Sequence, residues 1–563
     1  MQNYIEILQS SPDAQRGTGR ENLLTKTTGT YYTPEIVGRR LVRAVLEAAP
    51  PPVEGPVSAI DPFCGDGRLI VWLLEEAQLT PDWAGRSWRV ALWDCDHESL
   101  SAAEQNVTSS ARRLNLECLI ERRHGDTFEL FVQQYGVPGQ LNIQGAPMEQ
   151  QDYDLVVTNP PWEVVKPDTR DLLPLDEGTR EKYISALRMF SQRLTEHFPT
   201  SMPKTRFAGW GVNLARVGVE VAVRLGRAGG AVGIVSPASV CADQASEMLR
   251  RWLLTEHGMK QIAHYPAEAF LFQGVDQPHV DLIVIPHMPE ETAHIEVVQF
   301  DTAGEEINRR LLRSPRATLE ANRFVLQVLA TAQQINVMER MVILPQLKEL
   351  QGSQSGQLWT GRELDESGHT ALLTDDETSP VFFKGRMLNR LEPPVTSSRI
   401  WVSPTSFPSC QFPRLVWRDV SRPTQKRRVQ ATLIPAGWMT GNSLGVAHFR
   451  EHDQRRLLGL LGVFSSLPFE FQVRSILTTN HVSVGAIREV RVPPLSDEFL
   501  DLLAPIMRRR LQGEAAAEVE MEVVVAQAYG LNQDELQTVM DALPKLTYEE
   551  RQTILTSPHW RLP

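Results

Sequence analysis

Short apolar runs alternate with longer amphipathic stretches over the first 300 residues of this 563-residue chain. The apolar runs predict strands at 57–60, 88–93, 118–121, 153–157, 231–235 and 280–285. The amphipathic stretches predict helices at 35–49, 69–77, 98–114, 214–225 and 243–254. Strands and helices in this order predict an α/β domain whose parallel sheet is covered by helices on both faces.

The pattern changes after about residue 300. Residues 307–341 are compatible with helix and predict a connector, and from about residue 345 Gly, Ser, Pro and aromatic residues become more frequent. The tail beyond Pro493-Pro494 favours helix and is acidic. We therefore predict a Rossmann-like α/β domain followed by a mixed α+β domain, divided as leader 1–28, catalytic domain 29–300, helical connector 301–344, second domain 345–495 and acidic helical segment 496–563.

Composition narrows the class of protein. The net charge of −12 argues against nonspecific coating of nucleic acid, but residues 381–430 hold ten basic and two acidic side chains. The five cysteines are scattered without a C-x-x-C pair, which predicts reduced thiols and no structural metal. No stretch approaches the roughly 20 apolar residues that span a bilayer, so we expect a cytoplasmic protein with no membrane partner.

Acidic residues and glycines follow the first three predicted strands. The segment from Asp61 to Gly67 lies between a strand and a helix, where backbone N–H groups can approach a ligand. Asp94 and Asp96 end the second strand, and Gly125-Asp126 follows the third. Each Asp could simply cap a helix. Three at successive strand ends fit an adenosine-containing ligand better, because a carboxylate there can accept ribose hydroxyls.

The fourth predicted strand runs into Asn159-Pro160-Pro161-Trp162. Two consecutive prolines make a rigid loop whose carbonyl groups can accept hydrogen bonds, although the prolines cannot donate any. The side-chain oxygen of Asn159 and the carbonyl of Pro160 could together accept from one exocyclic amine. Trp162 offers a flat face for a stacked base; the alternative is a core tryptophan beside a Pro-Pro loop.

With these motifs the chain resembles the γ-class N6-adenine DNA methyltransferases, which use S-adenosylmethionine (AdoMet). The resemblance rests on the segment from Gly29 to Pro34, the segment from Asp61 to Gly67, the Asn159 tetrapeptide and the segment from Gly229 to Pro237, in the γ-class order. It implies a Rossmann-like AdoMet-dependent methyltransferase domain and catalytic roles for Asn159, Pro160, Pro161 and Trp162. The implied cofactor-binding residues are Tyr32, Thr33, Pro34, Asp61, Phe63, Gly65, Gly67, Asp94, Cys95, Asp126 and Thr127.

The second domain resembles the target-recognition domains of such enzymes, most of all the adenine methylases of type IIS restriction–modification systems. The resemblance covers Phe383 to Arg386, Asp419 to Gly445, and Leu461 to Val473 followed by Arg491 to Pro494. A solvated basic surface is the alternative interpretation of the cations in this region. We predict instead that a DNA groove includes Lys384, Arg386, Arg414, Arg418, Arg422, Lys426, Arg427 and Arg428.

The resemblance implies methyl transfer from AdoMet to adenine N6 in duplex DNA, with the target base flipped out of the helix. Phe270 or Phe272 could cover the second face of that base. Other enzymes with an Asn-Pro-Pro-aromatic loop methylate guanine in ribosomal RNA or glutamine in release factors. N4 methylation of cytosine is chemically close, because cytosine also offers an exocyclic amine, and a noncatalytic DNA-binding subunit of a defence complex is a further alternative. Asn rather than Ser before Pro-Pro favours adenine.

Double-stranded DNA is the expected partner, in a bacterial, nucleoid-associated setting. Only about 28 residues precede the segment that begins at Gly29, which are too few for a nuclease domain. The tail has no convincing Asp…Glu-x-Lys arrangement of a nuclease. We therefore expect cleavage to belong to a separate restriction endonuclease, with a companion methylase as another expected partner.

Overall fold

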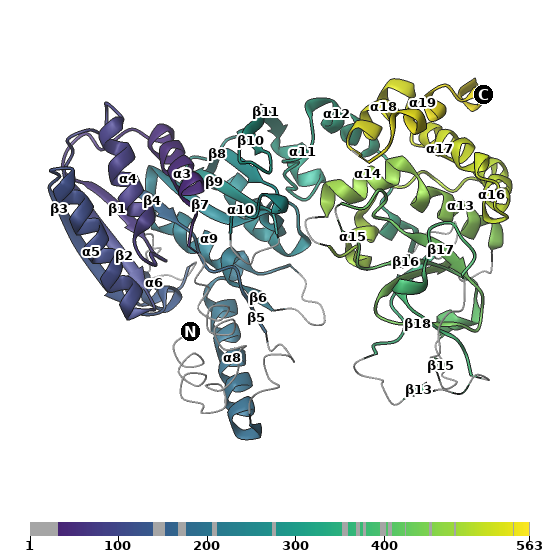
Figure 1. Cartoon of the computed structure of the whole chain (residues 1–563), viewed down its shortest axis with the longest axis horizontal. Coiled ribbons are helices and arrows are strands. Elements are labelled where there is room, and N and C mark those ends of the chain that lie inside the picture. Colours follow the sequence, from purple (N-terminus) through teal and green to yellow (C-terminus); the bar gives the residue numbers. More distant parts are fainter. Residues whose placement is uncertain are drawn as a thin grey trace. The chain divides into compact units, whose positions relative to one another are not determined.

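The computed structural model divides into two compact units, Met1–Val328 and Leu329–Pro563. Each unit is described by itself (Figure 1). The predicted leader 1–28 and the residues Gly29 to Tyr31 lie outside the described part of the chain. The structure describes residues 32–138, 153–166, 176–204, 211–272, 277–351, 358–366, 372–374, 376, 379–394, 401–402, 408–422, 424–449, 453–477, 480–543 and 545–561.

Unit 1 is built around a nine-stranded sheet in the order β11-β10-β8-β9-β7-β4-β1-β2-β3. Its strands are β1 Val57–Asp61, β2 Trp88–Asp94, β3 Cys118–His124, β4 Tyr153–Thr158, β7 Gly226–Pro237, β8 Gly258–Tyr265, β9 His279–Ile285, β10 Thr292–Phe300 and β11 Glu306–Pro315, and a separate pair is β5 Val164–Val165 with β6 Val212–Asn213. Its helices are α3 Glu35–Ala48, α4 Arg68–Leu79, α5 His97–Arg113, α6 Thr127–Tyr135, α8 Glu177–His197, α9 Leu214–Leu225, α10 Glu247–Thr255 and α11 Arg316–Ala321.

The predicted α/β architecture is confirmed for the core of this unit. Strands β3, β2, β1, β4 and β7 are parallel, as the alternation predicts. Helices α3, α4 and α5 pack side by side, while α9 packs on β4 and β7. Every residue of β1 and β4 is buried, which explains why these strands are mostly apolar.

Two sequence-based expectations are wrong at the other half of the sheet. Strand β9 runs antiparallel to both β7 and β8, so the sheet is mixed. Residues 306–315, expected to begin a helical connector, form β11, which pairs antiparallel with β10. The turn between these two strands includes Gly304 at a φ of +79°, a conformation that glycine adopts at little cost. Pairing across this turn therefore overrides the local helical pattern.

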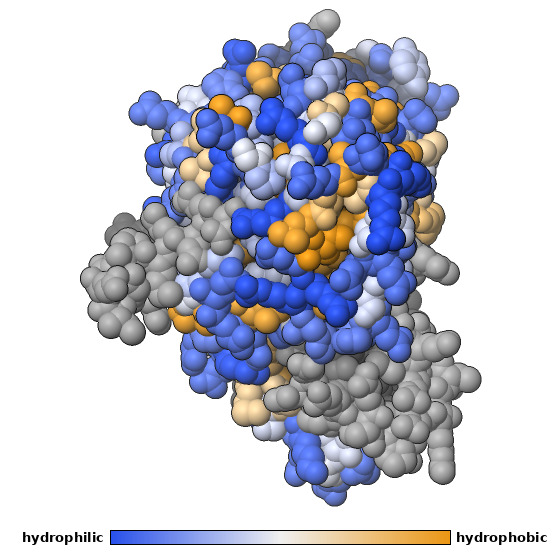
Figure 2. Space-filling view, turned by 90° about the vertical axis from the view of Figure 1, so that its left-hand side faces the viewer, coloured by the Kyte–Doolittle hydropathy of each residue, from blue (hydrophilic) through white to orange (hydrophobic). Residues whose placement is uncertain are grey.

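The opposite edge of the sheet is β3. Its last four residues, from Glu121 to His124, are all exposed, and Leu119 is exposed as well. Figure 2 faces the side on which β3 lies in Figure 1 and shows a mostly hydrophilic surface around one apolar patch. Charged side chains along an edge strand disfavour pairing with another sheet edge.

Unit 2 combines a small antiparallel sheet, in the order β12-β19-β16-β17, with a helical core. Its strands are β12 Leu358–Gly361, β13 Leu373–Thr374, β14 Phe382–Phe383, β15 Trp401–Val402, β16 Arg414–Arg418, β17 Ala431–Ile434, β18 Met439–Thr440 and β19 Leu444–Phe449. Its helices are α12 Ala332–Met341, α13 Gln454–Ser465, α14 Leu467–Ile476, α15 Val484–Glu489, α16 Asp497–Leu511, α17 Ala516–Ala528, α18 Gln533–Asp541 and α19 Tyr548–Leu555.

One hydrophobic core joins the four-stranded sheet of unit 2 to the helices. It includes Trp417 of β16, Phe464 of α13 and Val523 of α17, all fully buried. The ring of Trp417 packs 5.6 Å from that of Phe464, centroid to centroid. The acidic C-terminal helices are therefore part of the same folded core as the sheet.

Candidate functional site at the sheet edge

The carboxyl ends of β1, β2, β3 and β4 lie at one edge of the sheet because these strands are parallel neighbours. Asp61 and Asp94 are the last residues of β1 and β2. Asp126 follows β3 by two residues, and Asn159 directly follows β4. The fold thus brings together the ends of four strands that carry the predicted cofactor and catalytic residues.

Asp61 connects the first of these strands to the fourth. Its side-chain oxygen accepts hydrogen bonds from the Phe63 backbone N–H at 3.1 Å and from the Thr158 hydroxyl at 2.8 Å. Burial of the carboxyl raises its pKa to about 7, and negative Asp94 and Asp66 act in the same direction. Thr158 directly precedes Asn159, so this contact fixes the start of the Asn159 loop.

Two glycines shape the loop after β1. Gly65 and Gly67 have φ values of +51° and +78°, which favour glycine. A Cβ atom on Gly67 would lie 2.9 Å from the Cα atom of Ala103 in α5, so a side chain there would displace the loop. The Gly65 N–H donates to Asp94 Oδ2 at 2.8 Å, which joins this loop to the end of β2.

Asp94 also accepts from the Asp96 N–H at 2.8 Å through its other oxygen. Burial raises the pKa of Asp94, while these backbone donors lower it. The neighbouring Cys95 has a pKa raised to about 12, chiefly by burial and then by Asp94 and Asp126. The Cys95 thiol is therefore protonated near neutral pH and is no nucleophile. The Cys95 backbone carbonyl lies 3.1 Å from His124 Nε2.

Asp126 and Thr127 are both buried at the start of α6. Asp126 caps the helix by accepting from the Phe128 N–H at 2.9 Å. The Thr127 hydroxyl donates to the carbonyl of Pro62 and so ties α6 to the loop after β1. Helix capping, the alternative weighed for this Asp, is thus present, and contact with an adenine ring stays a prediction.

Thr33 joins the N-terminal element to the catalytic loop. Its buried hydroxyl oxygen lies 3.2 Å from Asn159 Nδ2 and accepts from it. Arg68 donates to the Thr33 carbonyl at 3.2 Å, pairs with Asp66 at 2.7 Å, and places its guanidinium 4.4 Å from the centroid of the Tyr32 ring. Asp66 and Arg68 thereby hold the segment that precedes α3.

Pro160 is fixed by a glycine that sequence analysis overlooked. Gly218 of α9 faces this proline so closely that a Cβ atom on Gly218 would lie 2.2 Å from Pro160 Cβ. The same atom would be 3.5 Å from the Phe63 ring. A glycine within a helical pattern is the signal that could have indicated this close approach.

Trp162 packs mostly inside the unit, with 9% of its surface exposed. Its ring centroid is 5.0 Å from that of Phe272 and 6.1 Å from that of His279. His279 stacks on Tyr265 at 4.7 Å, and burial lowers the pKa of His279 to about 3, so this ring is neutral. Core packing, the alternative reading of Trp162, is therefore present, and base stacking stays a prediction.

The two phenylalanines considered for the second face of a base differ in position. Phe272 is buried against Trp162, whereas Phe270 is 71% exposed with a φ of +46°. Of the two, only Phe270 is on the surface. Sequence reasoning had no signal to separate them.

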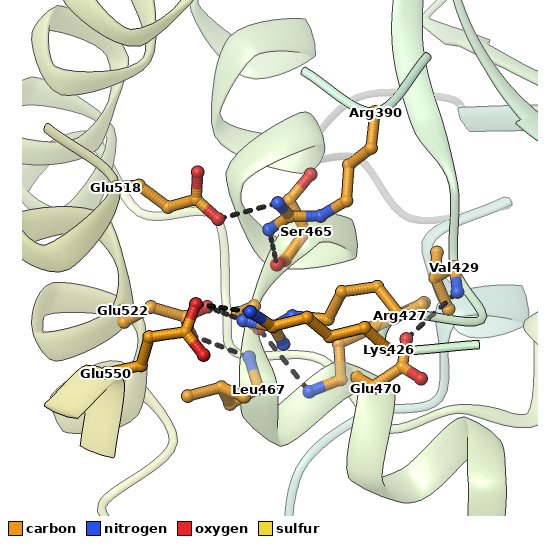
Figure 3. Close-up of polar contacts among 12 residues, drawn as sticks. Arg390, Lys426, Arg427, Val429, Ser465, Leu467, Glu470, Glu518, Glu522 and Glu550 are labelled. Carbon is orange, nitrogen blue, oxygen red and sulfur yellow. Dashed lines mark hydrogen bonds and ion pairs between the residues drawn. The ribbon is translucent and has the colours of Figure 1, made fainter. Parts of the chain in front are cut away.

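Most of the cations predicted to line a DNA groove are held within unit 2. Lys384 pairs with Glu366 at 2.7 Å, and Arg418 donates to the carbonyls of Gly385 and Leu388. Figure 3 shows Arg427 beside Glu522, at 2.5 Å, and Lys426 beside Glu550. The neighbouring Arg390 pairs with Glu518 at 2.6 Å, and these three glutamates come from α17 and α19.

Two of the predicted DNA contacts are wrong. Arg414 is fully buried in an ion pair with Glu363 at 2.8 Å. Arg428 is 2% exposed and donates to the Ser421 carbonyl. A guanidinium inside the protein cannot contact a phosphate, and no local sequence pattern indicates that Glu363 is the partner of Arg414. Arg386 and Arg422 are exposed.

Two further searches of the described residues were negative. They include no helix that is long and apolar enough to cross a membrane. They also include no group of three or more His, Cys, Asp or Glu side chains placed to hold a metal ion.

No protein-family model matches this chain. Among solved structures, it is similar to a nuclease-deletion mutant of the Type ISP restriction-modification enzyme LlaGI in complex with a DNA substrate mimic. The identity is 13% and the TM-score 0.51, over 91% of this chain and 49% of that deletion mutant. It is also similar to DrdV in a DrdV–DNA complex, with 11% identity and a TM-score of 0.52 over 88% of this chain and 58% of DrdV. The chain thus shares the fold of these two proteins and spans about half to three-fifths of their length.

Proposed function

We propose that this chain is a site-specific DNA methyltransferase of a restriction–modification or phage-defence system, which transfers a methyl group from AdoMet to adenine N6. The observation that carries this proposal is the meeting of the Asp61–Gly67 loop, Asp94 and the Asn159 loop at one edge of the sheet. The fold shared with LlaGI, a restriction-modification enzyme, supports the same class.

The residues at the ends of β1 and β2 fit AdoMet. A carboxylate at the end of the second strand is suited to ribose hydroxyls, and Asp94 occupies that position. Gly65 and Gly67 keep side chains away from the loop after β1, so that the backbone can approach a ligand. Bound AdoMet would supply a methyl group already activated on a sulfonium.

Asn159 and Pro160 would hold the target amine. Asn159 Nδ2 donates to the Thr33 hydroxyl, and Oδ1, the other end of this amide, would accept an amine hydrogen. The Pro160 carbonyl would accept the second hydrogen. Acceptors on both hydrogens favour a tetrahedral nitrogen, which frees its lone pair for attack on the methyl group. The rate enhancement would then come from positioning and electrostatics.

Access to N6 requires the adenine to leave the DNA stack, which costs a few kcal/mol. The exposed ring of Phe270 and the accessible part of Trp162 are the aromatic surfaces proposed to stack on the flipped base. Of the cations first predicted to contact DNA, Arg386, Arg422 and Lys426 stay in the proposal because they are exposed. Duplex DNA is the proposed substrate, and a separate endonuclease the proposed partner.

The proposal is tested by incubating the full chain with isotope-labelled AdoMet and either duplex DNA or ribosomal RNA. We expect label only in DNA. The Asp94→Ala variant should lose calorimetric AdoMet binding and transfer together, because no other carboxylate ends β2. Label only in RNA, or unchanged AdoMet affinity in this variant, would contradict the proposal.

A further inference from the structure

Asp419 is a buried carboxylate held between two exposed side chains of unit 2, those of Arg362 and His481. Its Oδ1 atom accepts from Arg362 at 2.6 Å, and its Oδ2 atom lies 2.7 Å from His481 Nδ1. The Asp419 side chain is 7% exposed, whereas those of Arg362 and His481 are 45% and 60% exposed. One interior group therefore orients two side chains that face solvent.

The backbone around Asp419 is equally well fixed. Asp419 follows β16, its N–H donates to the Ser443 carbonyl at 3.0 Å, and its carbonyl accepts from the Val482 N–H at 2.6 Å. The indole of Trp417 donates to the Val482 carbonyl at 2.9 Å. The segments 419–421 and 480–482 thus form a short pair of extended strands anchored to the core.

Other exposed side chains continue this surface. Val420, which pairs with His481 across the two segments, is 51% exposed, and Arg422 and Asn480 are exposed as well. We name Arg362, Val420, Arg422, Asn480 and His481 the Asp419 patch. Rigid Arg, Asn and His donors beside a small apolar side chain are the chemistry that contacts phosphates and base edges in duplex DNA.

We propose that the Asp419 patch is a DNA-contacting surface of unit 2, on which Asp419 is a positioning residue. This inference rests on the proposed function, since it assumes that DNA is the substrate. It also assigns DNA contact to Arg362, Asn480 and His481, which the DNA groove predicted from the sequence did not include. Two of the cations predicted to line that groove, Lys426 and Arg427, form ion pairs with α19 and α17 instead.

The Asp419→Asn variant separates positioning from simple charge. Removing a negative charge should strengthen binding to DNA if only net charge matters. Asn keeps only one acceptor oxygen, so one of the two contacts to Arg362 and His481 is lost, which should instead weaken binding roughly fivefold for one net hydrogen bond. The signs are opposite, so affinity decides between them.

The measurement is titration of the full chain, without AdoMet, into a fluorescent duplex of random sequence at several salt concentrations. Arg362→Gln should weaken binding and flatten the slope of log affinity against log salt by about one. His481→Gln should weaken binding too, and Asp419→Asn should bind roughly fivefold more weakly at an unchanged Tm. The control is Arg455→Gln, because Arg455 pairs instead with exposed Asp497 and Asp501 and should leave affinity and slope unchanged.

Wild-type affinity and slope in Arg362→Gln and His481→Gln would overturn the inference, as would Asp419→Asn that binds DNA as tightly as wild type. If Asp419→Asn does not fold, the DNA affinities of Arg362→Gln and His481→Gln alone decide whether the patch contacts DNA. Methyl transfer by wild type to the same duplexes is measured in parallel. If wild type transfers methyl groups to DNA and the variants bind DNA like wild type, only the inference about the Asp419 patch is overturned. If wild type transfers no methyl group, the proposed function is overturned.

Discussion

At the scale of single residues, the site depends on contacts between side chains far apart in the chain. Thr33 and Asn159 are 126 positions apart, and their 3.2 Å contact joins the segment before α3 to the Asn159 loop. Asp61 and Thr158 are 97 positions apart and hold the same loop from the other side. The order of the strands makes both contacts possible.

Replacing Thr33 by Val tests the first contact, because Val has the same shape but no hydroxyl. We expect the rate of methyl transfer to fall about 3-fold to 10-fold, the range of one net hydrogen bond. Thr33→Ser keeps the hydroxyl and should recover most of the wild-type rate. Single-turnover transfer kinetics measure both variants; equal rates for Val and Ser would contradict the role of the hydroxyl.

Asp61 should make stability depend on pH. Its pKa of about 7 in the folded protein lies above the ordinary value of 3.8, so the folded state binds the proton more tightly than the unfolded state. The cost of burying the charged form is absent below the ordinary pKa, grows as pH rises toward 7, and is complete above it. Asp61→Asn removes this term, so the Tm of the variant minus that of wild type should rise from pH 4 to pH 7 in calorimetry. A constant difference would contradict the raised pKa.

At the scale of elements, α9 supports the Asn159 loop. Gly218 is the position in α9 where Pro160 approaches. Alanine in a helix is ordinarily more stable than glycine by about 1 kcal/mol, so propensity alone predicts that Gly218→Ala is stabilising. The 2.2 Å approach predicts instead a lower Tm and a slower transfer.

The matched control is Gly178→Ala, in the first turn of α8, where the nearest atom to a new Cβ is at 3.5 Å. This variant should keep the wild-type transfer rate. Thermal unfolding and transfer rates measure both variants. A Gly218→Ala protein that is as active as Gly178→Ala would show that α9 does not hold the loop.

The ion pairs between basic residues of segment 381–430 and the C-terminal helices should contribute to stability more than to DNA affinity. Glu522 of α17 is 1% exposed and accepts from Arg427 at 2.5 Å and from the Leu467 N–H at 2.7 Å (Figure 3). Removing one partner of a buried ion pair leaves the other charge unsatisfied, at a cost of about 3–5 kcal/mol. We expect Glu522→Ala and Arg427→Ala both to unfold at lower denaturant concentration. Arg427→Ala with wild-type stability and a flatter salt slope for DNA would contradict this role.

At the scale of the whole molecule, the sequence predicted unit 1 better than unit 2. Periodicity identified β1, β2, β4 and α9 nearly residue for residue because buried parallel strands and amphipathic helices differ in their apolar pattern. The direction of β9 and the pairing of β11 depend on partners across the sheet, which no local pattern records.

The residues of the candidate site also divide into those that the sequence could predict and those that it could not. The residues that end β1, β2 and β4 could be predicted, because fold order alone brings those ends together. The burial of Trp162 and the pairing of Arg414 with Glu363 could not, since each depends on side chains that reach the residue through tertiary packing. A count of charges in a segment therefore identifies basic residues but does not show which of them face solvent.

Methyl transfer to adenine N6 by the Asn159 loop is the activity proposed for this chain. The most direct test is mass spectrometry of nucleosides from duplex DNA incubated with labelled AdoMet and either wild type or Asn159→Ala. We predict labelled N6-methyladenine with wild type and none with the variant, while calorimetry shows nearly equal AdoMet affinity for both proteins. Label in N4-methylcytosine, or substantial N6-methyladenine from Asn159→Ala, would contradict the account.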